Sequence, residues 1–132
     1  MVDESVIHEK LRLYFDTPGG DVEHAQELYQ EDAVLEFPQS GERFEGIDNF
    51  TEWRSQYPTT AGFRIRRVTV RKDFAVVELT ASYDGGPSLH GVALMDFRGD
   101  KIGRERIYLG EPWDPPEWRA RWRSDTPADP PA

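Results

Sequence analysis

The sequence predicts one α+β domain, with helices in the first half of the chain and a curved, mostly antiparallel sheet in the second. Three observations support this fold class. Apolar residues repeat at helical intervals before residue 58, they alternate with polar residues between about residues 63 and 109, and turn-forming residues separate the alternating segments. A chain of 132 residues has room for one such domain.

Three helices are predicted in the first half of the chain. The first covers residues 3–15, the second begins near Asp21, and the third runs from Ile47 until Pro58 ends it. The first helix would present one apolar face with Val6, Ile7, Leu11, Tyr14 and Phe15, and the second would bury Val22, Ala25, Leu28 and Tyr29. In the third, the residues that repeat at helical intervals are Ile47, Phe50, Trp53, Arg54 and Tyr57. A short strand over residues 33–37 separates the second helix from the third, so the helices have a sheet to pack on.

Four longer strands are predicted in the second half of the chain. They cover residues 63–72, 75–83, 88–98 and 101–109. The turns between them are short and rich in Gly and Asp, so neighbouring strands should pair as antiparallel hairpins. In the first of these strands Phe63 and Ile65 share one parity and Val68 the other, which predicts a bulge near Arg66 and Arg67 that bends the sheet.

Residues after the last strand predict a short helix and a tail. Residues 117–123 follow a run of prolines and place Trp118 and Trp122 one turn apart, so this helix should cap the pocket or a partner subunit. The basic side chains beside these tryptophans favour local cation–π packing. Residues 124–132 are Pro-rich and polar, which predicts a disordered tail after a domain over residues 1–123.

Composition excludes several classes of function. A net charge of -9 disfavours a nucleic-acid partner, and the absence of Cys excludes disulfides and thiolate chemistry. The three His residues lack the spacing of a metal site, and no Gly-rich phosphate loop follows a strand. We therefore expect a cytoplasmic protein with no metal, no cofactor and no membrane association.

The element order and three local segments resemble the nuclear transport factor 2-like superfamily, in its SnoaL-like (polyketide cyclase-like) branch. Residues 28–38 are similar to the superfamily's helix-to-strand segment, residues 44–50 to its entry into the third helix, and residues 98–108 to the last hairpin of the SnoaL-like branch. The resemblance covers about residues 4–122. It implies a cone-shaped α+β barrel with three N-terminal helices on the concave face of the sheet, around a pocket for a small organic molecule.

The catalytic residues of these relatives do not transfer to this chain. The resemblance places Phe37 where ketosteroid isomerases have a general-base Asp, and Ala93 near the position of their protonated acid. Tyr14 lies within one position of their oxyanion-binding Tyr. SnoaL-like cyclases and epoxide hydrolases have an inward Asp where this chain has Ile107. The resemblance therefore implies the fold more strongly than it implies a reaction.

Alternation along the last strand singles out Glu105. If Ile107 faces the pocket, Glu105 and Leu109 do too, because side chains two apart share one face. A carboxyl group in an aromatic cavity has a raised pKa and can exchange protons near neutral pH. Glu105 and Tyr14 are therefore the catalytic candidates. The structural alternative for Glu105 is a pair with an arginine or a place at the rim.

The same alternation predicts the lining of an apolar, aromatic-rich pocket. Its candidate ligand-binding residues are Phe37, Trp53, Tyr57, Leu79, Tyr83, Met95 and Ile107. Such a lining suits a planar or polycyclic ligand, with Tyr hydroxyls for directional hydrogen bonds and Trp53 for stacking. The alternative is that these side chains only fill the core.

The opposite face of the sheet predicts a dimer interface. Val92 and Leu94 lie there beside polar residues, a face too apolar in places to be plain surface. The resemblance also implies a homodimer through this outer face, in which Glu78, Arg104 and Arg106 would form ion pairs between subunits. His90 has the same outward parity and is not a candidate base.

The sequence is compatible with two functions. In the first, a SnoaL-like small-molecule-binding protein cyclises, isomerises or dehydrates a hydrophobic carbonyl compound by cofactor-independent acid/base chemistry at Glu105. In the second, the chain is a non-catalytic ligand-binding or assembly module of the same fold, as the missing Asp residues suggest. The ligand's identity stays open in both.

Overall fold

A computed structural model describes residues 3–16, 27–56, 61–83, 86 and 88–128. The elements are α1 (Glu4–Asp16), β1 (Tyr29–Phe37), β2 (Glu42–Glu45), α3 (Ile47–Ser55), β3 (Ala61–Arg71), β4 (Phe74–Tyr83), β5 (Leu89–Arg98), β6 (Lys101–Gly110) and the 3-10 helix η1 (Glu117–Trp122). Most of the predicted second helix lies outside the described residues, although Leu28 near its predicted end is buried. The predicted α+β class is confirmed.

One six-stranded sheet forms the body of the molecule, in the order β2-β1-β6-β5-β4-β3. Neighbouring strands from β3 to β6 pair antiparallel, as their short turns predict. β1 pairs with β6 in parallel, with Leu35 opposite Glu105. This single parallel pairing joins the first part of the chain to its last strand.

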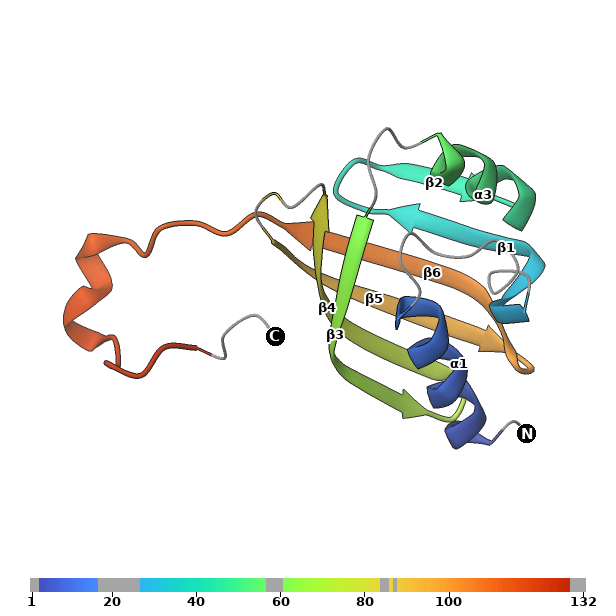
Figure 1. The fold of residues 1–132 in the computed structure, drawn as a ribbon, viewed down its shortest axis with the longest axis horizontal. Helices are drawn as coiled ribbons and strands as arrows, with labels where there is room; N and C mark the ends of the chain where they lie inside the picture. Colours follow the sequence, from blue (N-terminus) through green and yellow to red (C-terminus); the bar gives the residue numbers. More distant parts are fainter. Residues whose placement is uncertain (1–2, 17–26, 57–60, 84–85, 87, 129–132) are drawn as a thin grey trace.

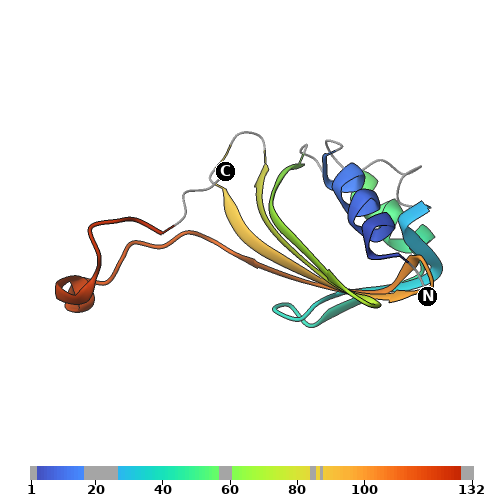
Figure 2. The same cartoon turned by 90° about the horizontal axis from the view of Figure 1, so that it is seen from below.

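The sheet is strongly curved, and α1 and α3 lie on its concave side (Figures 1 and 2). The register between β3 and β4 shifts between Ile65 and Arg67, which confirms the predicted bulge. A bulge bends its strand and increases the local twist, so it contributes to this curvature. One extra residue in the sequence thus accounts for part of the cone shape.

The core lies between the concave face and the helices. From α1 it receives Ile7, Leu11, Tyr14 and Phe15, whereas Val6 is 40% exposed, so its predicted place on the buried face is wrong. Two polar contacts hold α1 against the sheet: Lys10 Nζ donates to Asp100 at 3.0 Å, and Glu4 accepts from the backbone N–H of Lys72 at 3.0 Å.

β2 is an element that the sequence analysis missed. Residues 42–45 are mostly charged, but they pair antiparallel with residues 34–37 of β1. Gly46 follows at φ 92°, a left-handed conformation that favours glycine, and α3 begins at the next residue. This turn places Phe44 and Trp53 against each other, with ring centroids 5.0 Å apart.

Candidate active site

A buried polar cluster lies inside the core, formed by Tyr14 of α1, Tyr29 of β1, Arg54 of α3 and Glu105 of β6. Glu105 is 1% exposed and Tyr29 is 2% exposed. The Tyr29 hydroxyl donates a hydrogen bond to Glu105 Oε1, and Arg54 Nη1 donates one to the Tyr14 hydroxyl. The two tyrosines also interact with each other, their ring centroids 5.8 Å apart. The four side chains therefore form one connected group.

Burial and the neighbouring groups shift the pKa of Glu105 in opposite directions. Loss of hydration raises the pKa of Glu105, while the positive charge of Arg54 and the hydrogen bond from Tyr29 lower it, and the net direction is upward from the ordinary value of 4.5. A carboxyl group with a raised pKa exchanges a proton closer to neutral pH than an exposed one. Its place on the inward face is as the alternation predicts, away from the rim.

The other three groups keep their protons. Burial raises the pKa of Tyr14 and raises that of Tyr29 further, so both hydroxyls remain hydrogen-bond donors at neutral pH. Burial alone would lower the pKa of Arg54, but Tyr14, Tyr29 and Glu105 more than offset this, and the net shift is upward. The cluster thus combines a titratable carboxyl, two neutral donors and a permanent positive charge.

A groove of about 370 Å³ lies between α3, the β1–β2 hairpin and the end of β6. Its described lining is Phe37, Gln39, Ser40, Glu42, Phe44, Trp53 and Leu109. Leu109 and Glu105 lie on the same inward face of β6, with Ile107 between them. The Gln39 side chain is held by two hydrogen bonds to the backbone of Leu109, at 2.6 and 2.7 Å. The groove and the polar cluster therefore share β6 and α3, since Trp53 and Arg54 are neighbours.

The predicted site residues divide into four groups. Phe37 and Trp53 line the groove, and Glu105 and Tyr14 belong to the buried cluster. Leu79 and Met95 are fully packed core residues, and Ile107 packs against the core while half-buried. Tyr57 and the side chain of Tyr83 lie outside the described part of the structure. Leu79 and Met95 thus lie in the packed core, and their part in ligand binding stays a prediction.

Sequence reasoning assigned no functional part to Tyr29, Arg54 or Phe44. A signal existed for Arg54, because a cation at a helical interval from Phe50 falls on the apolar face of its helix. Arg54 Cζ lies 5.7 Å from the Phe50 ring centroid and 5.8 Å from that of Trp53. Tyr29 carried no comparable signal, since its meeting with Glu105 depends on the parallel pairing of β1 and β6.

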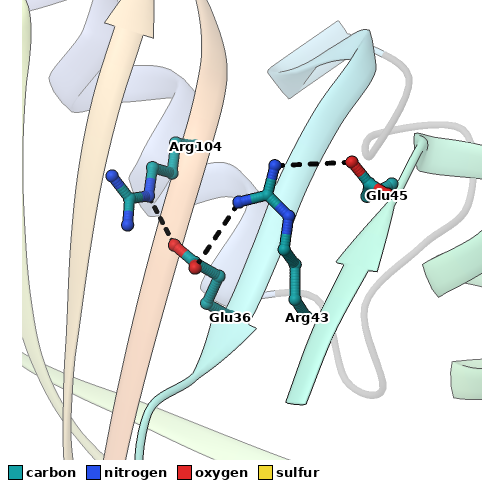
Figure 3. A network of polar contacts seen from close by, with 4 residues as sticks. All are labelled: Glu36, Arg43, Glu45 and Arg104. Carbon is teal, nitrogen blue, oxygen red and sulfur yellow. Dashed lines mark hydrogen bonds and ion pairs between the residues drawn. The ribbon is translucent and has the colours of Figure 1, made fainter. Parts of the chain in front are cut away.

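The outer face of the sheet carries ion pairs within one chain. Figure 3 shows Glu36 between two arginines: Arg104 Nε donates to it, and Arg43 lies 3.6 Å away and pairs also with Glu45 at 3.4 Å. The hydrogen bond from Arg104 lowers the pKa of Glu36. Arg104 thus has a partner on the adjacent strand of its own chain, and ion pairs between subunits stay a prediction. His90 is exposed on this face, as predicted.

Within the described ranges, no cluster of three or more His, Cys, Asp or Glu residues is arranged to hold a metal ion. No helix there is long and apolar enough to cross a membrane.

Comparison with known proteins identifies the family. A model of the SnoaL-like domain matches residues 13–105. A structure of an NTF2-like protein of unknown function from Burkholderia xenovorans is 31% identical, with a TM-score of 0.82 over 94% of this chain and 98% of that one. A candidate ketosteroid isomerase from Kribbella flavida is 26% identical, with a TM-score of 0.85 over 98% and 96%. No protein of curated function matches.

A more distant structure shares the fold alone. It is a Catenulispora acidiphila protein with a ketosteroid isomerase-like fold, in complex with trimethylamine, 14% identical with a TM-score of 0.63 over 83% of this chain and 88% of that one. The cone of helices on a curved sheet and the match over most of the chain give one conclusion: this chain belongs to the SnoaL-like domain family, within the NTF2-like fold.

Proposed function

We propose that the protein binds a hydrophobic carbonyl compound between its helices and the concave face of the sheet, and that Glu105 moves a proton on this compound. The reaction class is a cofactor-independent cyclisation, isomerisation or dehydration. One observation carries the proposal: a carboxyl group only 1% exposed accepts a hydrogen bond from Tyr29 in a cluster that also holds Arg54 and Tyr14.

The cluster contains the groups that an enolisation needs. Ionised Glu105 would take the proton from the carbon beside the carbonyl, and the electron pair of that C–H bond would move to the carbonyl oxygen. Tyr14, whose hydroxyl accepts from Arg54, would donate its own O–H to this oxygen, since the O–H of Tyr29 is donated to Glu105. The charge of Arg54 would stabilise the negative charge that develops there. Protonated Glu105 would then return the proton to another carbon, or to a leaving hydroxyl in a dehydration.

The groove is the proposed entrance for the substrate. Phe37, Phe44 and Trp53 present three aromatic rings there, with centroids 5.0 to 6.2 Å apart, which suits a planar ligand stacked on Trp53. A structure of the same fold with trimethylamine supports a small-molecule ligand in this architecture. Because Glu105 is closed to solvent, substrate entry requires side chains between it and the groove, such as Ile107, to move.

The second candidate is a non-catalytic binding or assembly module. The observation that favours it is that Glu105 already has a protein donor and little exposure, as a structural carboxyl in a satisfied core network would. In this case the groove binds its ligand and the cluster only holds α1 and α3 on the sheet.

One experiment separates the two candidates. A thermal-shift panel of polycyclic ketones, steroids and aromatic carbonyl compounds identifies binders, since a ligand of the folded state raises stability by RT ln(1 + [L]/Kd). Each binder is then tested for proton exchange at the carbon beside its carbonyl by NMR in D2O. Catalysis requires exchange that falls at least about 100-fold in Glu105→Gln. The control is Glu78→Gln, an exposed carboxylate on the outer face of β4. Binding with equal exchange in both variants assigns the module instead.

We also propose a homodimer through the outer face of the sheet. Val76, Val92 and Leu94 are half-buried there without a covering layer among the described elements, and Tyr108 beside them is 37% exposed. The ion pairs of Glu36 give this face a charged border. A partly apolar face with a charged border is typical of an interface between copies.

A further inference from the structure

The C-terminal arm, defined here as residues 111–123, leaves the body of the molecule at the end of β6. Figures 1 and 2 show it projecting away from the sheet and both helices. Trp113, Trp118 and Trp122 are 78%, 74% and 68% exposed. All residues of η1 are described, and none of them is buried. The expectation that this helix caps its own pocket is therefore not met.

Three exposed indoles within ten residues need a covering surface. Tryptophan is among the most buried residue types on average, and each indole buries roughly 150–250 Å² when it is covered. A 3-10 helix of six residues has no core of its own, and within it Arg121 Cζ lies over the Trp122 ring, 4.5 Å from the centroid. No described residue of the domain covers these rings, so the arm offers them to a surface of another molecule.

We propose that the arm clasps a second copy of this chain, with Trp118 and Trp122 packed on the partner. This proposal rests on the homodimer proposed above and adds the arm to its interface. In a twofold dimer the contact occurs twice, once for each arm. Four tryptophans would then bury roughly 600–1,000 Å² of their own surface, a large part of the roughly 1,600 Å² total of a standard stable interface, and the sheet faces would supply the rest.

Charge favours a second copy as the partner. Residues 118–123 contain Arg119, Arg121 and Arg123 and no acidic residue. Residues 1–110 contain 20 Asp and Glu against 13 Lys and Arg, so the body of a partner copy is acidic. The whole arm is neutral, because Glu111, Asp114 and Glu117 balance its three arginines, but the charges are separated along it and residues 118–123 are basic. This basic, aromatic end and an acidic body attract each other, whereas the acidic body opposes docking on an anionic membrane.

The position and the length of the arm also favour a second copy of this chain as its partner. The arm begins three residues after Tyr108, which lies on the outer face of β6 where the partner is proposed to sit. Residues 111–116 precede η1 in a largely extended form and span at most about 20 Å. The arm of one subunit thus reaches past a sheet-to-sheet contact onto the side of its partner.

The test measures the dimer dissociation constant of the full chain by fluorescence-detected sedimentation, with circular dichroism as the check of folding. We expect Trp118→Ser/Trp122→Ser to raise Kd at least tenfold, because buried tryptophans are frequent hot spots. The matched control, Leu13→Ser, removes another exposed apolar side chain, on α1, and should leave Kd unchanged. An unchanged Kd in the double variant overturns the clasp.

Two further measurements distinguish a wrong clasp proposal from a wrong homodimer proposal. If Val92→Lys dissociates the dimer while the double variant does not, the sheet interface stands and the clasp is wrong. If the unmodified protein is a monomer at micromolar concentration, both are wrong. Neutral phosphatidylcholine vesicles test a membrane as the alternative partner. A blue shift of tryptophan emission on vesicles, together with a monomer in solution, assigns the arm to a membrane and overturns the clasp.

Discussion

The hydroxyl of Tyr29 donates a hydrogen bond to the carboxyl group of Glu105, which lies 76 positions later in the chain, and both side chains are closed to solvent. The two residues meet because β1 and β6 pair in parallel, with Leu35 opposite Glu105. This contact joins the first strand of the sheet to the last one through the core, so a change at either residue should affect both stability and protonation.

Tyr29→Phe removes one hydroxyl and leaves a buried acceptor with one donor fewer. We expect unfolding in urea to show a loss of about 1–3 kcal/mol, the cost of an unsatisfied buried polar group. Because the Tyr29 hydrogen bond lowers the pKa of Glu105, its removal should raise that pKa further. Tyr108→Phe, at an exposed position of β6, is the control and should change stability by less than about 0.5 kcal/mol. Equal effects of the two changes would contradict a structural role for this hydrogen bond.

The pH dependence of stability should carry the signature of Glu105. Its pKa in the folded protein is raised, so the folded state holds this proton more tightly than the unfolded state does. Its contribution is therefore fully present below the ordinary value of 4.5 and is lost as pH rises through the folded-state pKa. We expect the stability of the unmodified protein relative to Glu105→Gln to fall over this window, by about 1.4 kcal/mol for each tenfold difference in proton affinity between the folded and unfolded states. A difference that rises with pH would show a lowered pKa instead.

Arg54→Met tests the cation of the cluster. Without this charge the pKa of Glu105 should rise, because Arg54 lowers it in the unmodified protein. The Tyr14 hydroxyl also loses its donor, so stability at neutral pH should fall by about 1–3 kcal/mol. The measurement is the ¹³C chemical shift of the Glu105 carboxyl group across a pH titration. Arg12→Met, on an exposed part of α1, is the control. An unchanged Glu105 titration in Arg54→Met would remove Arg54 from the electrostatics of the site.

Gly91→Ala should alter the groove more than the stability. A Cβ at this position would lie 2.7 Å from Leu109 Cδ2 and 3.1 Å from Leu79 Cδ1, both at the ends of flexible side chains. Leu109, which lines the groove, must therefore move, at a cost below about 1.5 kcal/mol. We expect the affinity for any groove ligand to change at least threefold, as measured by calorimetry. Gly110→Ala, whose Cβ meets nothing within 4 Å, should leave the affinity unchanged. The same affinity in both variants would argue against the groove as the binding site.

Val92→Lys should weaken the proposed dimer. The change places a charge in the middle of the outer face, where Val92 pairs with Glu78 and Tyr108 on the neighbouring strands. Even beside Glu78, a lysine covered by the partner subunit would lose its hydration, and this cost can exceed the attraction within a buried ion pair. We therefore expect Kd to rise at least 100-fold in analytical ultracentrifugation. Thr69→Lys, on the outer face of the edge strand β3, is the control. Dissociation by both variants to the same extent would place the interface elsewhere.

Local patterns in the sequence determined most of the fold. Alternation along residues 101–109 put Glu105 on the inward face, and the change of parity after Ile65 located the bulge, because both depend only on the period of a strand. Short turns set the hairpins from β3 to β6 for the same reason. β2 escaped prediction because Glu42, Arg43 and Glu45 carry no strand pattern, and the segment is a strand only through its pairing with β1.

The candidate site depended on contacts that no local pattern contains. The sequence indicated an inward carboxyl and an inward cation on a helix, but Tyr29, Arg54 and Glu105 come together only because β1 pairs with β6 and α3 packs on β1. The C-terminal arm is a second example. From Trp118 and Trp122 the sequence predicted a short helix, but it left open whether this helix covers the chain's own pocket or a partner subunit. Only the tertiary structure showed that the helix lies away from the chain's own pocket. The reason is that the partner of a side chain depends on which distant elements pack beside it.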